Sequence, residues 1–409
     1  MKKTIITILF CILSIVNAQS FGQNKVQYRD FDWKFISSPN FDVYYYGDEI
    51  ELANFTMEAS IEAYEQIAKH LRWNLKKRVS IIVYHSHNEF QQTNVVGVYM
   101  QCWDAKADGC TAEEDRADAA KVAAHLGIKF KSLDFVKEYK ENVIEHFYDE
   151  YKAGRTPNPD VLCNKEIKFG MFLDWAVAEG FNYVATGHYA RVIEDVGEFK
   201  LLRGIDDSKD QSYFLYLLNQ DQLSKTLFPL GLIKKEKVRE IAEEVGFHNA
   251  DKADSVGICF IGEVDIKEFL KKRIDEKLGD VVNKDGEVIG DHDGVWFYTI
   301  GQRHGFRTSK YHGMPLYVTG KDVGTNQLIV GYAKDGEREN FEVDDVHWIG
   351  KDLGDSLDCT VRIRHLGELY EARYEEGLVK LKYPTFGVAP GQSAVFYVGE
   401  HTVGGGVIK

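Results

Sequence analysis

The chain has 409 residues, of which 44% are hydrophobic and 28% are charged, as in an ordinary globular protein of about two to four domains. Its 36 glycines and seven prolines follow no repeat, which excludes collagen-like, proline-rich and solenoid proteins. The formal net charge of −14 excludes a global basic field, and six cysteines without a CxxC pair exclude a disulfide scaffold and a zinc ribbon.

The first eighteen residues have the pattern of an export signal. Lys2 and Lys3 precede an apolar run over residues 4–16, and small residues before Gln19 provide a cleavage site. The run is too short for a permanent membrane span, which needs about 20 residues. A buried N-terminal helix is the alternative. No other segment of the sequence is long and apolar enough to cross a membrane, so a membrane is not an expected partner.

The chain from residue 19 to residue 96 has the pattern of a separate α/β segment. Aromatic and β-branched residues predict strands at 41–46 and 79–84, and apolar residues at helical spacing predict a helix at 59–71. Two histidines follow the second strand without a third ligand, so no metal site is predicted. The segment weakly resembles the start of exported TolB-like proteins, a resemblance from which no functional residue is transferred.

From Gly97 onward the pattern is that of a cytosolic α/β enzyme. Strand and helix patterns alternate, with strands at 98–100 and 183–186 and helices at 111–126, 137–151 and 161–179. Such alternation predicts a parallel sheet covered by helices on both faces. After about residue 280, short strands and Gly-rich turns predict an all-β module, a small barrel.

Cys163 is the first candidate for chemistry. It follows a loop stiffened by Pro157 and Pro159, and we expect it in the first turn of the next helix. Backbone N–H groups, the helix dipole and nearby Lys165 favour a thiolate there. Asp160, one turn earlier, could exchange a proton with this sulfur or with a substrate. On these residues alone, a buried packing cysteine is the commoner alternative.

Cys259 is the second candidate. Gly257 and Gly262 flank it and predict a flexible loop that could move the sulfur. A core cysteine is again the alternative. The other cysteines of this part of the chain are expected to be packing or surface thiols: Cys102, Cys110 and Cys359.

Together, these two segments closely resemble the tRNA-specific 2-thiouridylase family. The first reads NPDVLCNKEIKF from Asn158, and the second reads SVGICFIG from Ser255. Three further segments match the family: ATGHYAR from Ala185, KDQSYFL from Lys209 and WFYTIGQR from Trp296. The resemblance extends from residue 97 to residue 409 through several independent motifs, so we regard it as specific.

The resemblance implies an enzyme that replaces the 2-oxygen of the wobble uridine of tRNA by sulfur. ATP, with Mg²⁺, would adenylate this oxygen and make it a leaving group. A persulfide on Cys259, loaded by a sulfur-relay donor or a cysteine desulfurase, would deliver the sulfur. Cys163 would be the nucleophile that releases it, which leaves a transient Cys163–Cys259 disulfide. Asp160 would be the acid–base residue.

The family also implies ligand contacts. Met100 and Gly187 would contact the adenine nucleotide. Contacts with tRNA are implied at Asn158, Pro159, Asp160, His188, Lys209, Asp210, Gln211, Arg364, His365 and Gln392. The residues alone support such a contact at 362–365, where cations on alternate positions of a strand would share one face. A solvated strand face is the alternative reading of that segment.

The implied fold is α/β, with a truncated adenine-nucleotide-hydrolase-like (PP-loop) parallel sheet domain, a small central domain and a C-terminal β-barrel. We expect five parts: a signal-peptide-like segment at 1–18, an unrelated α/β segment at 19–96, an incomplete catalytic domain at 97–228, a central domain with the second cysteine at 229–305, and the barrel with tRNA contacts at 306–409.

One family motif is missing. The family opens with a phosphate-binding loop, SGGVDSS, but neither SGGxDS nor a Walker-type GK[ST] occurs in this sequence. We therefore expect little adenylating activity. A chimeric reading frame joined between Gln92 and Gly97 would explain both this gap and the signal-like start, which conflicts with the cytoplasmic location that the family implies. A catalytically inactive tRNA-binding remnant and an exported fusion protein are the alternatives.

Overall fold

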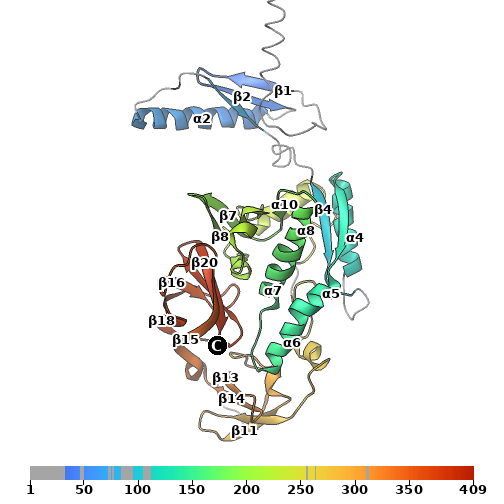
Figure 1. Cartoon of the computed structure of the whole chain (residues 1–409), viewed down its shortest axis with the longest axis vertical. Helices are drawn as coiled ribbons and strands as arrows, with labels where there is room; N and C mark the ends of the chain where they lie inside the picture. The colour runs from blue at the N-terminus through green and yellow to red at the C-terminus, as the bar shows by residue number, and fades with distance from the viewer. Residues whose placement is uncertain are drawn as a thin grey trace, which may run out of the picture. The chain divides into compact units, whose positions relative to one another are not determined.

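The computed structural model describes residues 33–46, 50–71, 75, 78–83, 95–104, 112–254, 257–262, 264–309 and 313–409. The chain divides into two compact units, Met1–Val96 and Gly97–Lys409, and each is described by itself (Figure 1). The signal-like segment 1–18 lies outside the described residues. Among the helices that are described, none has the length and apolar character that a bilayer span requires.

The first unit contains a three-stranded sheet and one helix. β1 (Trp33–Ser37) pairs antiparallel with β2 (Phe41–Tyr46), and β2 pairs parallel with β3 (Val79–Ile82). The connection between β2 and β3 contains α2 (Ile50–Leu71), which begins nine residues before the predicted helix. Sheet and helix share one core, formed by Phe41, Val43, Tyr45, Ala53 and Met57.

The second unit begins with alternating strands and helices. Its first elements are β4 (Val96–Gln101), α4 (Ala112–His125) and β5 (Lys129–Asp134), followed later by β6 (Val184–Ala185) and β9 (Thr226–Leu227). β4 pairs with β5, and β6 pairs parallel with β9. Within the described residues these are two separate two-stranded sheets, so the alternating pattern does not form one continuous ladder there.

Two long helices contain π-helical turns, in which the backbone hydrogen bonds span five residues. The first runs through α5 (Val136–Tyr139), η2 (Lys140–Ile144) and α6 (Glu145–Lys152), and the second through α7 (Pro159–Leu162), η3 (Cys163–Met171) and α8 (Phe172–Ala178). The predicted apolar face of the first helix is confirmed, because all four of its residues are buried: Tyr139, Val143, Phe147 and Tyr151.

A hairpin and short helices follow the second long helix. They are β7 (Ala190–Asp195), β8 (Glu198–Arg203), η4 (Ser212–Leu215), α9 (Gln220–Ser224), α10 (Lys235–Glu244) and α11 (Ile266–Lys271). The hairpin β7–β8 does not join the α/β strands. It pairs instead with the last strand of the chain, since Leu202 and Leu201 face His401 and Thr402.

A five-stranded sheet lies at one end of the unit, the lower end in Figure 1. Its strands, in spatial order, are β12 (Arg307–Thr308), β11 (Val288–His292), β10 (Gly279–Val282), β14 (Gln327–Gly331) and β13 (Tyr317–Asp322). β10 and β14 are parallel, and the other pairs are antiparallel. The sheet includes strands beyond residue 305, where the sequence suggests the start of the barrel domain.

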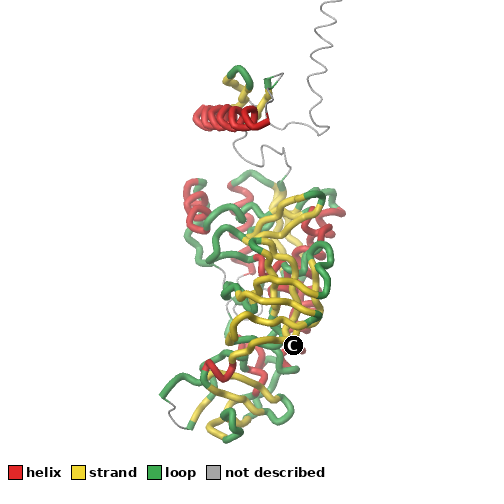
Figure 2. Tube along the Cα trace, turned by 90° about the vertical axis from the view of Figure 1, so that its left-hand side faces the viewer, coloured by secondary structure: helices red, strands yellow, loops and turns green. Residues whose placement is uncertain are grey.

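The last part of the chain is a closed barrel. Its strands are β15 (Glu337–Trp348), β18 (Leu378–Phe386), β17 (Tyr370–Glu375), β16 (Ser356–Arg362), β19 (Ser393–Val398) and β20 (His401–Ile408), and β20 pairs back to β15 (Figure 2). Close packing requires glycine in β20, because a Cβ on Gly404 would lie 2.1 Å from the His347 carbonyl oxygen. The predicted C-terminal barrel is confirmed.

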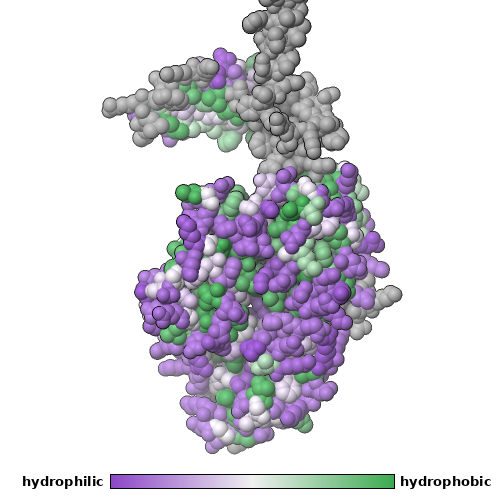
Figure 3. Space-filling view, in the orientation of Figure 1, coloured by the Kyte–Doolittle hydropathy of each residue, from purple (hydrophilic) through white to green (hydrophobic). Residues whose placement is uncertain are grey.

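The surface of the second unit is mainly hydrophilic. On the face shown in Figure 3, polar and charged side chains cover most of this unit, and apolar residues form small separate areas. Acidic residues outnumber basic ones by 64 to 50 in the whole chain. Attraction for an anionic partner therefore depends on local groups of cations.

Candidate active site

The helix that carries Cys163 begins two residues earlier than the sequence predicts. Asn158 is the N-cap, and its Oδ1 accepts a hydrogen bond from the Val161 N–H at 3.4 Å. Pro159 occupies the first helical position, where its missing N–H leaves no bond unmade. Cys163 is therefore in the second turn and not the first, and it is completely buried. Its own N–H already bonds to the carbonyls of Asp160 and Pro159, so the free N–H groups of the helix start do not serve its sulfur.

Cys259 lies in a tight loop that is held on both sides. Across the loop, the N–H of Ile258 donates to the Gly262 carbonyl at 3.1 Å, and the N–H of Gly262 donates to the Ile258 carbonyl at 2.9 Å. The N–H of Cys259 donates to Asp160 Oδ1 at 3.0 Å, and its carbonyl accepts from the Tyr139 hydroxyl at 2.6 Å. The structure thus shows a pinned loop, in contrast to the flexible one that the flanking glycines suggest.

The glycines of this loop serve its turn geometry. Gly257 and Gly262 have φ angles of +97° and +89°, which other residues rarely adopt. Phe260 also has a positive φ, +66°, in a region that costs a non-glycine residue about 1–3 kcal/mol. Its ring meets the Tyr139 ring edge-on at 5.9 Å, a contact that helps to hold the strained backbone in place.

The two predicted cysteines meet in the structure. Cys163 and Cys259 lie in one buried cluster, and each thiol shifts the pKa of the other, although 96 residues separate them in sequence. Both are free thiols, and both belong to the largest apolar cluster of the unit. Two neighbouring thiols of this kind can form and reopen a disulfide.

The two thiols hold their protons with different strength. Burial raises the pKa of Cys163 well above its ordinary value, and the neighbouring Cys259 raises it further. The pKa of Cys259 is lowered, first by the hydrogen bond from Cys163 and then by the positive charge of Lys168, which oppose the effect of burial. The expectation of a thiolate at Cys163 favoured by Lys165 is therefore wrong. Cys259 is the more acidic thiol, and Lys165 is exposed and pairs with Glu166 at 3.2 Å.

Asp160 is the carboxyl group of the site. It is half-buried in the first turn of the helix, where Asn164 Nδ2 donates to its backbone carbonyl at 3.0 Å. Burial raises the pKa of its carboxyl group, and the N–H of Cys259 and the charge of Lys168 partly oppose this. A carboxyl group that is shifted toward the neutral form beside two thiols can exchange a proton with them.

Known bacterial proteins align with most of this chain. The tRNA-specific 2-thiouridylase MnmA of Haemophilus ducreyi is 47% identical over 334 residues, which cover 78% of this chain and 87% of that protein. The proteins of the same name from Enterococcus faecalis and Bacillus subtilis are 46% and 44% identical over 337 and 330 residues, covering 78% of this chain and 89% of each relative. This chain belongs to the tRNA-specific 2-thiouridylase family.

Three family models match successive parts of this thiouridylase-family chain. They are a tRNA methyl transferase HUP domain at residues 79–263, a tRNA methyl transferase PRC-barrel domain at 267–332 and an aminomethyltransferase β-barrel domain at 338–408. They confirm the predicted family and the predicted fold class, an α/β domain followed by a central domain and a β-barrel. The HUP match begins before Gly97, where the sequence resemblance starts, and it includes β3.

The thiouridylase positions expected at the nucleotide lie in β4 and after β6. Met100 is half-buried against the core, and Gly187 is exposed. The next residue, His188, is buried between two phenylalanine rings, and its Nδ1 is 2.7 Å from Thr186 Oγ1. Burial holds the pKa of His188 well below its ordinary value, so its imidazole is neutral.

Gln392 connects the barrel to the loop before the active-site helix. Its Nε2 donates to the carbonyls of Thr156 and Pro157 at 2.9 and 3.1 Å. The N–H of Thr156 donates back to the Pro390 carbonyl at 2.8 Å. These bonds fix the loop that leads into Asn158, so three of the expected tRNA positions, Asn158 to Asp160, follow a rigid segment.

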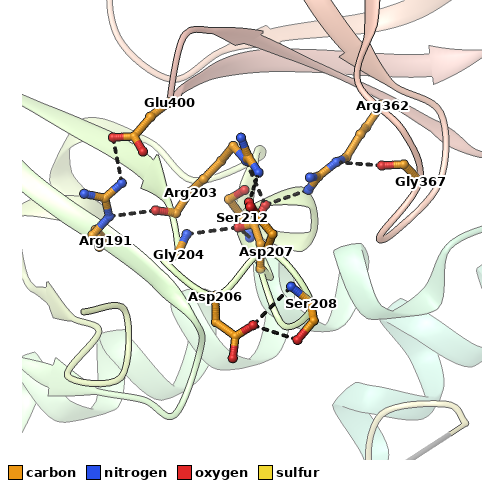
Figure 4. A network of polar contacts seen from close by, with 11 residues as sticks. Arg191, Arg203, Gly204, Asp206, Asp207, Ser208, Ser212, Arg362, Gly367 and Glu400 are labelled. Carbon is orange, nitrogen blue, oxygen red and sulfur yellow. Dashed lines mark hydrogen bonds and ion pairs between the residues drawn. The ribbon is translucent and has the colours of Figure 1, made fainter. Parts of the chain in front are cut away.

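Asp210 is the centre of a buried polar network. Its four partners are labelled in Figure 4: Arg203, Gly204, Ser212 and Arg362. Its side chain has no exposed surface, and its Oδ2 accepts from Arg362 at 2.6 Å and from Arg203 at 3.4 Å. Its Oδ1 accepts the N–H groups of Gly204 and Ser212, each at 3.1 Å. The network joins the end of β8, the start of η4 and the end of β16.

The neighbours of Asp210 are half-buried and bonded. Lys209 forms an ion pair with Asp254 at 2.7 Å. The side-chain oxygen of Gln211 accepts the Tyr189 N–H at 3.0 Å, and the backbone N–H of Gln211 donates to the Tyr189 carbonyl at 2.9 Å. The three expected tRNA positions 209–211 therefore form one ordered loop, in which the middle side chain points inward.

The cations at 362–365 do not share one face. β16 ends at Arg362, which is buried, and the chain then turns, with the Gly367 N–H bonded to the Arg364 carbonyl at 3.1 Å. Arg364 is exposed beyond the strand, so the expected phosphate track on one strand face is wrong. His365 packs against Phe214 with ring centres 4.3 Å apart and the ring planes tilted by 35°, and burial lowers the pKa of His365 to about 4.

The sequence alone did not indicate three residues that contribute to the site. Tyr139, Lys168 and Arg362 contact Cys259 or Asp210 across 91 to 152 residues of sequence, distances at which no local pattern marks a partner. Lys168 lies within a segment that matches the family, which is the one signal that points to it. In the part of the chain that the structure describes, no group of three or more side chains could hold a metal ion.

Proposed function

We propose that this chain performs the sulfur-transfer steps of tRNA 2-thiouridylation, in which sulfur replaces the 2-oxygen of the wobble uridine. One observation carries the proposal: Cys163 and Cys259 belong to one buried cluster, in which each thiol shifts the pKa of the other. The names of the relatives supply the substrate class, tRNA, and the product, 2-thiouridine.

The proposed cycle starts at Cys259. Its thiolate attacks the outer sulfur of a persulfide on a sulfur-relay protein or a cysteine desulfurase, which leaves as a thiolate, and Cys259 becomes a persulfide. This persulfide attacks C2 of a uridine whose 2-oxygen has been adenylated, and AMP leaves with that oxygen. The Cys163 thiolate then attacks the Cys259 sulfur and breaks its bond to the sulfur on C2. The uridine retains a 2-thiocarbonyl, and an external reductant supplies two electrons to reopen the Cys163–Cys259 disulfide.

Asp160 is the acid–base residue of this proposal. Its raised pKa and its bond to the Cys259 N–H suit a group that takes the proton of Cys163 before the second attack. A uridine that reacts at C2 must leave the anticodon stack. The rigid segment Asn158–Asp160 lies beside the thiols, where it can hold such a base.

The remaining family positions are proposed to bind tRNA in two ways. Arg364 is exposed and can contact phosphate directly. His365 and Gln392 are half-buried and contribute neutral polar groups, whereas His188 is buried and acts through the segment that it packs against. Asp210 acts through the loop that it holds, because its own carboxylate is buried, and this loop presents Lys209 and Gln211.

Adenylation is the step for which this chain is least equipped. The HUP domain, with Met100 and Gly187, is proposed to take ATP, and Mg²⁺ would enter with the ATP phosphates. The sequence has no SGGxDS to supply the backbone donors for pyrophosphate. We therefore expect little or no adenylation. We place the protein in the cytoplasm with tRNA, ATP and sulfur donors, a location with which the segment 1–18 conflicts.

Two measurements on the purified 409-residue chain test the proposal. Mild oxidation with diamide should give a Cys163–Cys259 disulfide in the tryptic map, which Cys163→Ser abolishes and the control Cys359→Ser leaves intact. Failure to form this bond rejects the sulfur-transfer role. Incubation with tRNA, ATP, Mg²⁺, a persulfide-loaded cysteine desulfurase and a reductant should give little 2-thiouridine by mass spectrometry, and efficient synthesis would overturn the expected lack of adenylation.

The missing phosphate loop also favours a second candidate, an inactive tRNA-binding remnant. This candidate predicts that Cys163→Ala leaves tRNA affinity unchanged, whereas Arg364→Ala weakens it and makes the salt dependence of binding less steep. It differs from the first candidate in the oxidation test, because a binding remnant has no need of a reversible disulfide. An exported fusion protein, the third alternative, would be found without residues 1–18.

A further inference from the structure

Lys168 is a half-buried cation that faces the two thiols, Cys163 and Cys259. Its ammonium group lies 5.6 Å from the centre of the ring of Phe260, the residue that follows Cys259. It forms no ion pair with a carboxylate among the residues that the structure describes, whereas Lys165 on the same helix pairs with Glu166. Cys259 makes the largest contribution to stabilising the positive charge of Lys168.

The π-helical turn explains how Lys168 reaches this position. Residues five apart on an α-helix point about 140° away from each other, because each residue turns the helix by about 100°. In η3 the hydrogen bonds span five residues, as shown by the Phe172 N–H that binds the Ile167 carbonyl. Cys163 is the first residue of η3 and Lys168 is the sixth, so the wider turn brings both toward Cys259.

The charges around the pair agree with this geometry. Burial alone would lower the pKa of Lys168, but Cys259, Cys163 and Asp160 together raise it, so the group stays cationic. The titratable groups that face Cys259 are Cys102 after β4, Tyr139 on α5, and Asp160, Cys163 and Lys168 on the active-site helix. Lys168 is the only cation of this set. The others are neutral or acidic groups that would disfavour a second negative charge.

We propose that the Lys168 ammonium group is the counterion of the Cys259 sulfur, holding it as an anion first as the thiolate that accepts sulfur and then as the persulfide that delivers it. This inference rests on the proposed function, and it assigns a catalytic role to a residue that touches a reacting atom. No proton or electron moves to Lys168 in the cycle. When Cys259 enters the disulfide with Cys163, its negative charge disappears and Lys168 loses its partner until the bond is reduced.

The test measures how the alkylation rate of Cys259 by iodoacetamide depends on pH, in the full chain, with the modified peptide counted by mass spectrometry. We expect Lys168→Met to raise the midpoint by at least about one pH unit, about a tenfold loss of rate at neutral pH. The matched control Lys165→Met, three residues away on the same helix, should leave the midpoint unchanged. Lys168→Arg keeps a cation at this position, so the midpoint of Cys259 should stay close to that of the wild type.

An unchanged midpoint in Lys168→Met, or an equal rise in Lys165→Met, overturns the inference. If Lys168→Met fails to fold, the wild-type titration decides alone, because a Cys259 midpoint at or above the ordinary thiol value of about 8.5 leaves no room for a counterion. The readout needs neither tRNA nor ATP. A chain that fails to form the Cys163–Cys259 disulfide on oxidation but shows the Lys168 effect would reject the proposed function and keep this inference.

Discussion

The two thiols of the site differ in their surroundings although they touch. Cys163 is enclosed by apolar side chains, and burial keeps it protonated, whereas Cys259 has a cation beside it and both of its backbone groups bonded. A persulfide carrier must be anionic to attack, and a releasing nucleophile needs its proton only until the last step. The order in which the two residues would act therefore follows from their environments.

His365 should make the stability of the fold depend on pH. Its pKa is about 4 in the folded chain, because burial disfavours the charged ring, and about 6.5 when unfolded. Between these values the unfolded chain binds a proton that the folded chain does not, so this contribution is complete above about pH 6.5 and is lost as the pH falls toward 4. His365→Phe, which keeps the ring on Phe214, should lose about 1–2 kcal/mol less stability between pH 7.5 and pH 5 than the wild type.

Urea unfolding at the two pH values measures this difference. The same decrease in stability in His365→Phe and in the wild type would contradict the assignment. A smaller decrease in the variant would support the assignment of His365 as a neutral side chain at neutral pH.

At the scale of elements, one ion pair connects parts that are distant in sequence. Arg362 at the end of β16 meets Asp210 at 2.6 Å, 152 residues away, and also donates to the Gly367 carbonyl at 3.0 Å. Its guanidinium lies 5.5 Å from the Tyr397 ring centre. The loop at 209–211 and the turn that carries Arg364 are thus held by the same side chain, so two expected tRNA-binding segments keep a constant spacing.

Arg362→Met should destabilise the chain by about 3–5 kcal/mol, because it leaves the buried Asp210 carboxylate without its closest cation. The double variant Asp210→Asn/Arg362→Met should recover part of that loss, since it removes the uncompensated charge. The exposed Arg373, paired with Asp358 at 2.7 Å, provides the control, and Arg373→Met should change stability by no more than about 0.5 kcal/mol. Equal effects of the two single variants in urea unfolding would contradict the argument.

Local sequence patterns predicted the helices and strands well. They did not predict the contacts between segments that are distant in sequence. The alternating strands and helices, the buried face of the first long helix and the barrel all follow from periodicity. The π-helical turns do not, because a run such as CNKEIKFGM has no local mark that separates a π-turn from an α-turn. Arg362 faces inward because its partner comes from another part of the chain. The alternation of residues along a strand cannot predict such a partner.

The same division holds for the site. Motif resemblance selected both cysteines and Asp160, which the structure brings together. The protonation pattern was predicted for the wrong cysteine, since it assumed a helix start at residue 161 and a cation at Lys165. Both errors concern offsets of two or three residues, which on a helix change the direction of a side chain completely.

On the scale of the whole molecule, the chain has two units with separate cores. The first core contains Val43 and Met57, and the second is centred on the aromatic cluster around Tyr139 and Phe147. Units that each bury their own apolar side chains commonly unfold separately. Because the net charge is −14, attraction of an anionic partner must come from local groups of cations.

Calorimetry of the full chain should therefore show two unfolding transitions. Val43→Ala, at a completely buried position of the first unit, should cost about 2 kcal/mol and lower only one of them. The larger transition should keep its midpoint and its enthalpy. A single cooperative transition that moves as a whole would show that the two units stabilise each other.

The proximity of Cys163 and Cys259 also means that their oxidation state reports the redox conditions in which the chain folded. The two thiols lie in one cluster and influence each other's pKa, so the ambient glutathione potential would decide whether a disulfide between them stays open. Under the proposed mechanism the pair would be closed only during turnover inside a reducing cell, whereas beyond an export signal it would be oxidised permanently. The oxidised fraction of this one pair, trapped at the moment of lysis, thus reports which end of the chain, the signal-like start or the thiouridylase-like remainder, decides where the protein resides.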